Sequence, residues 1–336
     1  MVARTLAIAG LVTSLFIFSA CGSSDDSSTT SGDSGNDTAS AGGALDGATI
    51  YNNQYTEEIQ YFRDKTEGME DRAKELGATV ESEYGNVTPE VVVEQVENAL
   101  TRKPDAISIV PMDEASLLPV LRQAKEQGIP TFVTGAKVED LSLVDAFLGA
   151  ENDKIGEEKA QYVVDKLNGK GTVGIIRGIK GQSFSTEQGE GYEAVLSAAP
   201  GITVVDGGYA GGYASDLGLE RTENLLTRSP DIDAIIYDAD DLTLGGIQAI
   251  KQRGIANDDI VITSTDGGAE ALKKIQSGQI DLTVSLCGFA QGIQLLDLMD
   301  KALAGETLPD EIISKWQGYS TENIEELLKK PRSFCS

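Results

Sequence analysis

One stretch of this chain occurs twice, and this internal repeat constrains the fold more than any other feature. Residues 223–268 begin ENLLTRSPDIDAIIYDADD, and residues 97–135 begin with a diverged copy, ENALTRKPDAISIVPMDEA. Each copy predicts an amphipathic helix, a Pro-Asp turn, an apolar strand, a second helix and a second strand. Such alternation is typical of parallel sheets with right-handed crossovers. Because the copies begin 126 residues apart (97 against 223), about the size of a domain, the sequence predicts two similar α/β domains.

A pair of such domains encloses a cleft, and clefts between domains are preferred sites for small ligands. In open parallel sheets the ligand lies beyond the carboxyl ends of the strands. The side chains expected there are mostly carboxylates, amides and aromatics, a set that favours a neutral, polyhydroxylated ligand. These positions are Asn52, Asn53, Gln54, Tyr55, Tyr61, Phe62, Asp113, Thr134, Lys137, Glu151, Asn152, Arg177, Lys180, Gln182, Tyr209, Tyr213, Asp238, Asp240, Asp241, Asp266 and Leu286.

Several of these side chains have simpler explanations. Asp113 and Asp241 stand just before expected helices, where capping is the favoured interpretation. Asp266 could also be a cap, but its place directly at a strand end favours a ligand role. Two adjacent aromatics, Tyr61 and Phe62, cannot both face one side of a helix, so one is expected to face the cleft. The basic side chains are most often solvated charges; these are Lys137, Arg177 and Lys180.

The composition narrows the class of function. Asp and Glu number 54 against 27 Lys and Arg, for a net charge of −27. A surface this acidic repels phosphate backbones, so no nucleic-acid partner is expected. The chain has no histidine, which removes the commonest general base and metal ligand and favours a non-enzyme. Without a Walker, GxGxxG or GxSxG pattern, the sequence predicts no cofactor, no metal site and no catalytic residue.

The N-terminal segment is typical of an exported protein. Residues 1–20 form an expected signal peptide, in which Arg4 precedes an apolar run too short to span a membrane. The run FSAC at its end resembles the bacterial lipoprotein cleavage motif, in which Cys21 becomes the lipidated N-terminus. Residues 22–43 hold only Gly, Ser, Thr, Asp, Asn and two alanines. We therefore expect a lipidated Cys and disordered tether over residues 21–44, leashing the domain to the outer face of a membrane.

The two remaining cysteines, Cys287 and Cys335, allow two interpretations. Their spacing fits no zinc or CxxC site. In an exported protein they could form a disulfide, which is slightly favoured because exposed free thiols are a liability outside the cell. The alternative is two unpaired thiols, and geometry must decide between them.

Local patterns place the elements in a definite order. The first expected strand, Ala48–Tyr51, is followed by a loop and then by a helix from about Tyr61 to Leu76. Later helices are expected over Gly156–Leu167, Gly189–Ala198 and Gly292–Leu303.

Several runs together resemble a known family. They are PDIDAIIYDADDLTLGGIQAI, the strand end ITSTDGG, the turn EQGIP and the pair Tyr61-Phe62. The chain resembles the sugar-binding proteins of bacterial ABC importers, most closely the ribose-type group, over about Leu45 to Leu308.

The resemblance implies a periplasmic-binding-protein-like fold of type I. Two Rossmann-like lobes with parallel sheets would be joined by a three-crossing hinge and would close on a ligand. By analogy the crossings fall near Ala150, Cys287 and Ile312. The N-terminal lobe would then comprise residues 45–150 plus 287–311, and the C-terminal lobe residues 151–286 plus 312–336.

The family's pocket positions carry over only in part. Tyr61 and Phe62 match its aromatic pair, Tyr213 its aromatic in the second lobe, and Asp266 its strand-end Asp. The other ligand-contacting positions differ here, and they leave Lys137, Gln188, Asp238, Asp240 and Leu286 at or beside the expected pocket. Because the hydrogen-bonding set for a simple pentose is largely missing, a polyol, a deoxy or branched sugar, or a sugar-derived signal is expected.

The sequence therefore predicts a monomeric, lipid-anchored solute-binding protein that delivers a small polyhydroxylated solute to an ABC permease. A first alternative keeps the fold but presents the ligand to a membrane sensor. An extracellular enzyme on this scaffold is disfavoured by the missing histidine and nucleophile motif. A transcription regulator of the same fold is excluded by the export signal.

Overall fold

The computed structural model describes residues 43–86 and 88–333. The expected signal peptide, Cys21, most of the tether, and Cys335 lie outside these described residues. Within them, no helix is both long enough and apolar enough to cross a membrane.

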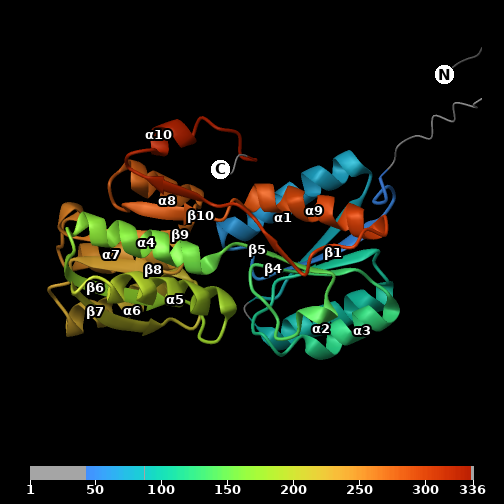
Figure 1. The fold of residues 1–336 in the computed structure, drawn as a ribbon, viewed down its shortest axis with the longest axis horizontal. Helices are drawn as coiled ribbons and strands as arrows, with labels where there is room; N and C mark the ends of the chain where they lie inside the picture. Colours follow the sequence, from blue (N-terminus) through green and yellow to red (C-terminus); the bar gives the residue numbers. More distant parts are fainter. Residues whose placement is uncertain (1–42, 87, 334–336) are drawn as a thin grey trace, which may run out of the picture. The chain divides into compact units, whose positions relative to one another are not determined.

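The first half of the described chain alternates strands with helices (Figure 1). Its elements are β1 (Thr49–Gln54), α1 (Gln60–Leu76), β2 (Thr79–Tyr84), α2 (Pro89–Arg102), β3 (Ala106–Ile109), α3 (Leu118–Gln127), β4 (Thr131–Thr134), the short η1 (Leu141–Leu143) and β5 (Ala146–Gly149). These strands form one sheet with β11 (Glu311–Ile313), in the order β11-β5-β4-β3-β1-β2, and all of its neighbours pair in parallel.

The second half repeats this arrangement. Its elements are α4 (Asn152–Lys166), β6 (Lys170–Arg177), α5 (Ser183–Ser197), β7 (Gly201–Tyr209), α6 (Ser215–Arg228), β8 (Ala234–Tyr237), α7 (Asp240–Gln252), the short η2 (Asn257–Asp259), β9 (Val261–Asp266), α8 (Ala269–Gln276), β10 (Leu282–Ser285), α9 (Gly288–Leu303), β12 (Gln317–Ser320) and α10 (Ile324–Leu327). The second sheet has the order β12-β10-β9-β8-β6-β7, and only its β12 pairs antiparallel.

The repeat in the sequence corresponds to equivalent elements of the two sheets. Its first copy covers the end of α2 and runs through β3, α3 and β4, and its second covers the end of α6 and runs through β8, α7 and β9. The expectation of two α/β lobes with parallel sheets is therefore confirmed.

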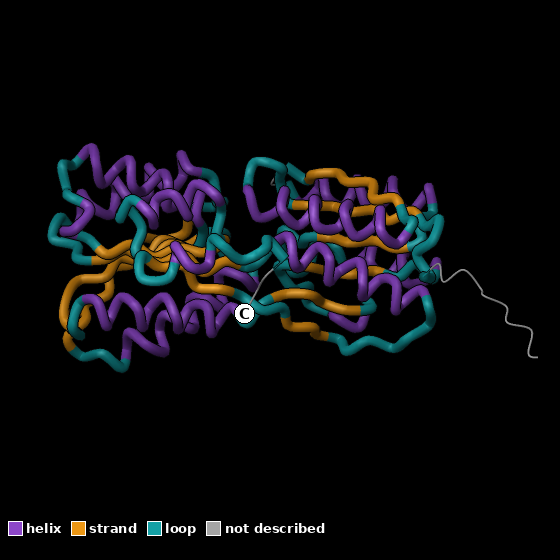
Figure 2. Tube along the Cα trace, turned by 90° about the horizontal axis from the view of Figure 1, so that it is seen from above, coloured by secondary structure: helices purple, strands orange, loops and turns teal. Residues whose placement is uncertain are grey.

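Helices cover both faces of each sheet. Figure 1 shows α1 and α9 on one side of the first sheet and α2 and α3 on the other, and Figure 2 shows helices on both sides of the second sheet, at left. In the first lobe Ile50, Phe132 and Leu148 face one way and pack with Met69 of α1 and Met299 of α9. The intervening strand residues belong to the cluster that holds the apolar sides of α2 and α3. Successive side chains of a strand point to opposite faces, so β1, β3, β4 and β5 are buried on both sides, whereas the edge strands β2 and β11 are not.

Glycines bring one equivalent pair of helices into direct contact in each lobe, and in the second lobe Gly218 and Gly245 do the same for α6 and α7. A Cβ on Gly68 of α1 would lie 2.1 Å from the carbonyl oxygen of Phe289, and one on Gly292 of α9 would lie 2.1 Å from that of Lys65. In the second lobe a Cβ on Gly156 of α4 or Gly191 of α5 would clash in the same way, at 2.3 and 2.1 Å from backbone oxygens. The backbones of these pairs thus touch where no larger residue fits.

The chain passes between the lobes three times, after β5, after β10 and between β11 and β12. The third passage lies slightly later than expected, because Ile312 and Ile313 pair with Leu148 and Gly149 in the first sheet. Trp316 lies in this passage, and its indole Nε1 donates to Oε2 of Glu158 on α4 at 3.0 Å.

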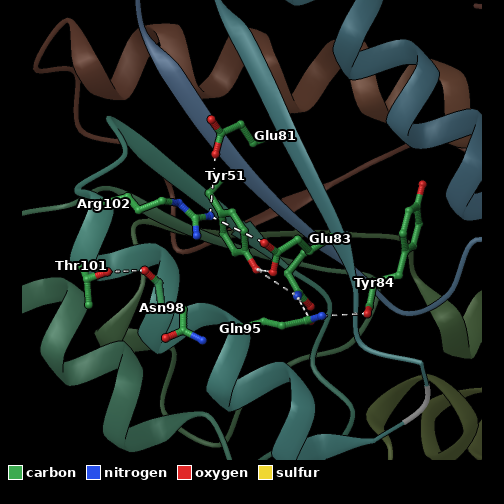
Figure 3. A network of polar contacts seen from close by, with 9 residues as sticks. Tyr51, Glu81, Glu83, Tyr84, Gln95, Asn98, Thr101 and Arg102 are labelled. Carbon is green, nitrogen blue, oxygen red and sulfur yellow. Dashed lines mark hydrogen bonds and ion pairs between the residues drawn. The ribbon is translucent and has the colours of Figure 1, made fainter.

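The first strand is longer than its apolar residues predict. It continues through Gln54 because its amides find partners inside the lobe: Asn52 Nδ2 donates to Ser82 Oγ at 3.0 Å, and Gln54 Nε2 donates to Asn52. On the opposite side, Tyr51 donates to Glu83 and Gln95 donates to the carbonyl of Tyr84 (Figure 3). These strand-end amides therefore stabilise the lobe and do not line the cavity described below.

Candidate functional site

A small cavity of about 50 Å³ lies where the carboxyl ends of both sheets meet, and we call it the central cavity. Its volume is little more than the ~30 Å³ share of one water molecule in the liquid. Any organic solute therefore requires the lobes to separate or the lining rings to move. The lining residues are Tyr55, Ile59, Tyr61, Phe62, Val110, Gly135, Ala136, Gln182, Phe184, Tyr213, Ala239, Asp266 and Leu286.

Aromatic rings from both lobes form most of the wall. Tyr55 stacks on Phe62 with ring centroids 5.6 Å apart, and Phe62 meets Tyr61 edge to face at 5.0 Å. Tyr213 of the second lobe meets Tyr55 at 5.8 Å and Phe184 at 5.9 Å, both edge-on. Because the contact between Tyr55 and Tyr213 joins the lobes, the structure represents a closed arrangement.

The local sequence holds these rings in place. Tyr61 and Phe62 begin α1, and the hydroxyl of Tyr61 donates to Gln291 Oε1 of α9 at 2.6 Å. Tyr213 packs directly on Gly178, where a Cβ would lie 2.0 Å from its ring. Glycine is therefore required at position 178 for Tyr213 to occupy this place.

Polar bonds between the lobes surround the rings. Gln182 Nε2 donates to the carbonyl of Pro111 at 3.3 Å, and the hydroxyl of Tyr213 donates to Gln182 Oε1. The backbone N–H of Lys137 in the first lobe donates to Ser183 Oγ of the second at 2.8 Å. Both functional groups of Gln182 are thus used within the protein.

Asp266 is the one acidic residue of the cavity wall. It ends β9 with φ at 120°, a conformation that non-glycine residues rarely adopt and that is often held at functional sites. Its only hydrogen bond among the described residues comes from the N–H of Asp240, at 3.3 Å to Oδ2. Burial, together with the nearby carboxylates of Asp240 and Asp241, raises the pKa of Asp266 well above its usual value.

Four of the eight pocket residues expected from the sequence line the cavity. These are Tyr61, Phe62, Tyr213 and Asp266. The other four are bonded elsewhere. Lys137 pairs with Glu187 and Glu311, both at 3.1 Å, at the edge of the lobes.

Gln188, Asp238 and Asp240 lie in the interior of the second lobe instead. Gln188 Oε1 accepts from Lys159 Nζ at 2.6 Å and from the hydroxyl of Tyr192 at 2.9 Å. Asp238 accepts from Gly178 N–H, Ser185 and Tyr192, and Asp240 accepts from Ser264, Thr283 and Gly268 N–H. These bonds hold the carboxylate of Asp238 against α5 and that of Asp240 against the hydroxyls of β9 and β10.

Two buried lysines near the cavity were not predicted. Lys65 of α1 is fully buried, donates to Thr134 Oγ1 at 2.7 Å, and lies 5.4 Å from the ring centroids of Tyr61 and Phe62. Burial lowers its pKa to about 7. Lys159 of α4 is equally buried, and burial lowers its pKa to about 8 although several carboxylates oppose the shift. Nothing in the local sequence distinguishes either lysine from the exposed ones, since burial depends on the opposite strand ends.

The expected caps have different outcomes. Asp113 accepts from the backbone N–H groups of Ala115 and Ser116, at 2.9 and 2.7 Å, so the simpler interpretation is correct there. Asp241 lies inside the first turn of α7, whose N-cap is Ala239, and makes no capping bond. The capping interpretation of Asp241 is therefore wrong. Arg177 pairs with Asp206 at 2.9 Å, away from the cavity.

Several lining residues were missed. Tyr55, Gln182 and Leu286 stood among the strand-end positions, but nothing singled them out. Phe184 was missed altogether, because α5 begins at Ser183 and not at Gly189 as its glycines suggest. Gly189 and Gly191 interrupt the apolar period, yet Gly191 is needed for the close contact with α4.

Cys287 stands between β10 and α9 in a left-handed conformation with φ at 54°. It is disulfide-bonded, and its partner lies outside the described residues. Across residues 43–86 and 88–333, no group of three or more acidic, Cys or His side chains is placed to hold a metal ion.

Comparison with known proteins places this geometry in a family. Residues 50–307 match the family described as the periplasmic binding protein domain. A xylitol-binding protein of Mycolicibacterium smegmatis is 26% identical over 280 residues, which cover 83% of this chain and 78% of that protein. A ribose import binding protein of Bacillus subtilis is 28% identical over 67% of this chain and 72% of its own length.

Solved structures of similar proteins have the same fold as this chain. A periplasmic ribose ABC transporter protein from Conexibacter woesei is 31% identical and superposes with a TM-score of 0.77, over 87% of this chain and 97% of that one. A galactofuranose-binding protein, 24% identical, shares the fold with a TM-score of 0.79, over 84% of this chain and 97% of its own. The type I fold predicted from the resemblance is confirmed.

Proposed function

Since this chain belongs to the periplasmic binding protein family, we propose that it captures a small sugar- or polyol-related solute between its lobes and delivers it to an ABC permease. The family acts outside the cytoplasm, and its relatives are binding proteins and not enzymes. The observation that carries the proposal is the central cavity, whose wall combines rings from both lobes with one carboxylate.

Closure of the lobes explains how such a site binds. Tyr55, Tyr61 and Phe62 belong to the first lobe, whereas Phe184, Tyr213 and Asp266 belong to the second. A solute between them gains contacts with both sets only when the lobes close, so binding favours the closed state. Tyr61, Phe62 and Tyr213 would stack on the solute, and Asp266 would accept its hydrogen bonds.

The four residues bonded elsewhere have a supporting role in this proposal. Asp238 fixes Tyr192 and the Gly178 backbone on which Tyr213 packs, and Asp240 fixes the turn after Asp266. Gln188 and Lys137 support the cavity from farther away. Gln188 accepts a hydrogen bond from Lys159, and Lys137 pairs with Glu187 at the edge of the lobes.

Anchoring and the disulfide complete the proposal. Cys21 would carry the lipid, and residues 22–43 would give the monomeric binding domain a reach of roughly 25 Å from the membrane. Cys335 is the proposed partner of Cys287, because among the three cysteines Cys21 would be lipidated. Replacing Cys21 by Ser should release the protein from membranes into the soluble fraction; retention would contradict the anchor.

Binding is tested by isothermal titration of residues 45–336 with sugars, polyols and their amino derivatives. We expect Tyr213→Ala and Asp266→Ala to weaken binding at least tenfold while leaving the circular dichroism spectrum unchanged. Tyr209→Ala is the matched control, since Tyr209 also ends a strand of the second lobe but contacts Arg177 outside the cavity. Unchanged affinity in both site variants would rule out the central cavity as the binding site.

A further inference from the structure

The central cavity offers a solute few free polar groups. Gln182 is bonded at both ends, and the hydroxyls of Tyr61 and Tyr213 donate to protein amides. Among the described residues the hydroxyl of Tyr55 has no hydrogen-bond partner, although the side chain is only 2% exposed. Tyr55 and Asp266 are therefore the least bonded polar side chains of the wall, while the hydroxyls of Tyr61 and Tyr213 keep only acceptor lone pairs.

This shortage disfavours a solute with many hydroxyls. Each hydroxyl that is removed from water and left without a partner weakens binding, because its hydrogen bonds to water are lost and not replaced. Two free groups can satisfy only part of a sugar ring, and the rest of the wall is aromatic or aliphatic. The solute that fits has one strongly polar group and a compact carbon frame.

The charged residues around the cavity indicate whether the polar group of the solute is positive or negative. The wall contains Asp266 and no Lys or Arg, while Asp240 and Asp241 lie close enough to raise the pKa of Asp266. Aromatic faces together with a carboxylate form an environment that attracts ammonium groups, because the negative face of each ring and the carboxylate both favour a positive charge. The net charge of −27 raises the local concentration of cations further.

Two lysines lie behind the cavity wall and could already supply a positive charge there. Lys65 lies 5.4 Å from the Tyr61 and Phe62 rings, but its lowered pKa leaves it largely neutral above pH 7. Lys159 is held by Gln188, Tyr237 and Thr265 inside the second lobe, where its charge offsets part of the field of Asp238, Asp240 and Asp266. Neither ammonium occupies the cavity, so a place for a positive group remains beside Asp266.

We infer that the solute carries an ammonium group, which pairs with Asp266 and is surrounded by the aromatic side chains of Tyr55, Phe62 and Tyr213. The inference rests on the proposed solute-binding function and narrows it to an amino-substituted sugar or polyol, or a comparable small organic cation. The free hydroxyl of Tyr55 would bond the neighbouring hydroxyl of the same solute. An ammonium group would stabilise the ionised form of Asp266, which burial and the nearby carboxylates disfavour by raising its pKa, whereas a neutral sugar supplies no such counter-charge.

The test compares matched pairs of charged and neutral probes by isothermal titration of residues 45–336. Glucosamine is measured against glucose, and choline, whose charge does not depend on pH, against xylitol. We expect each cation to bind at least tenfold more tightly than its neutral partner. Asp266→Asn keeps the size of the side chain and removes its charge, and should weaken cation binding at least tenfold.

Asp241→Asn is the control for long-range charge, because Asp241 is half-buried nearby but does not line the central cavity. We expect that variant to change cation affinity less than threefold. Tighter binding of glucose or xylitol than of the cations would overturn the ammonium inference and leave the proposed function standing. If no probe of either class binds, the proposed function falls as well.

Discussion

The two lobes share one architecture but bury their lysines differently. Both have the same strand order, and each joins two helices through glycines at a backbone contact. In the first lobe Lys65 reaches one hydroxyl and two aromatic rings. In the second, Lys159 donates three hydrogen bonds near three carboxylates. The same scaffold thus holds one poorly partnered buried cation and one well partnered one.

The difference shows which parts of a duplicated lobe are free to diverge. One helix contact that depends on glycine occurs in both lobes, between α1 and α9 and between α4 and α5, because any Cβ there meets backbone. A second, between Gly218 of α6 and Gly245 of α7, occurs only in the second lobe. The polar groups at the strand ends differ, because they need only find partners locally.

Replacing the well partnered lysine should have the largest effect. Lys159→Met removes the donor to Gln188, to the carbonyl of Tyr237 and to Thr265. It also removes the cation that faces Asp238 and Asp240. We expect a loss of about 3 kcal/mol in the free energy of unfolding, measured by urea denaturation at pH 7. A change below 1 kcal/mol would show that the network does not depend on the lysine.

The glycine contacts should be nearly as sensitive, and equally so in both lobes. Gly68→Ala and Gly191→Ala each force a Cβ against a backbone oxygen, at a cost of about 2 kcal/mol. Gly189→Ala, in the same helix as Gly191 but with no atom nearer than 3.5 Å, is the control. It should be neutral or slightly stabilising, because alanine favours helix. Equal effects of Gly189→Ala and Gly191→Ala would contradict the contact.

Replacing Lys65, the poorly partnered lysine, should raise the free energy of unfolding instead of lowering it. In the unfolded chain a lysine pKa lies near 10.4, whereas burial lowers that of Lys65 to about 7. Below pH 7 both states are protonated and the folded protein bears the full cost of the buried charge. As pH rises from 7 to about 10 only the folded state loses the proton, so this cost declines.

Lys65→Met should therefore stabilise the protein by about 1–2 kcal/mol at pH 6, and the gain should shrink toward pH 10. Thermal unfolding of both proteins across this pH range gives the comparison. A gain that stays constant with pH would show that packing, and not charge, is responsible.

The smallest expected effect concerns the C-terminal segment, which follows α10 and reaches back to the first lobe. Arg332 pairs with Asp64 at 2.9 Å and Glu67 at 2.8 Å and lies 4.6 Å from the ring centroid of Phe289. Because the groups are partly exposed, Arg332→Ala should cost less than about 1 kcal/mol. Arg102→Ala, which breaks exposed pairs within the first lobe alone, is the control. Only the Arg332 variant should speed hydrogen exchange in residues 328–333.

The sequence predicted the fold well because the repeat and the hydrophobic period are local signals. It also predicted Tyr61, Phe62, Tyr213 and Asp266, which stand at element ends where side chains face the cleft. It could not separate Asp240, which is bonded to the strands beneath it, from Asp266, which is almost unbonded. That distinction depends on hydroxyls from two different strands, Ser264 of β9 and Thr283 of β10, and only the folded arrangement brings them together.

The position of Trp316 gives the protein an internal optical signal. It is the only tryptophan in the sequence, and it lies in the third passage between the lobes with its indole bonded to Glu158. Hinge motion changes the angles of this passage and hence the surroundings of the indole. Emission excited at a wavelength selective for tryptophan therefore reports a single site, so closure can be followed in time without attaching a dye.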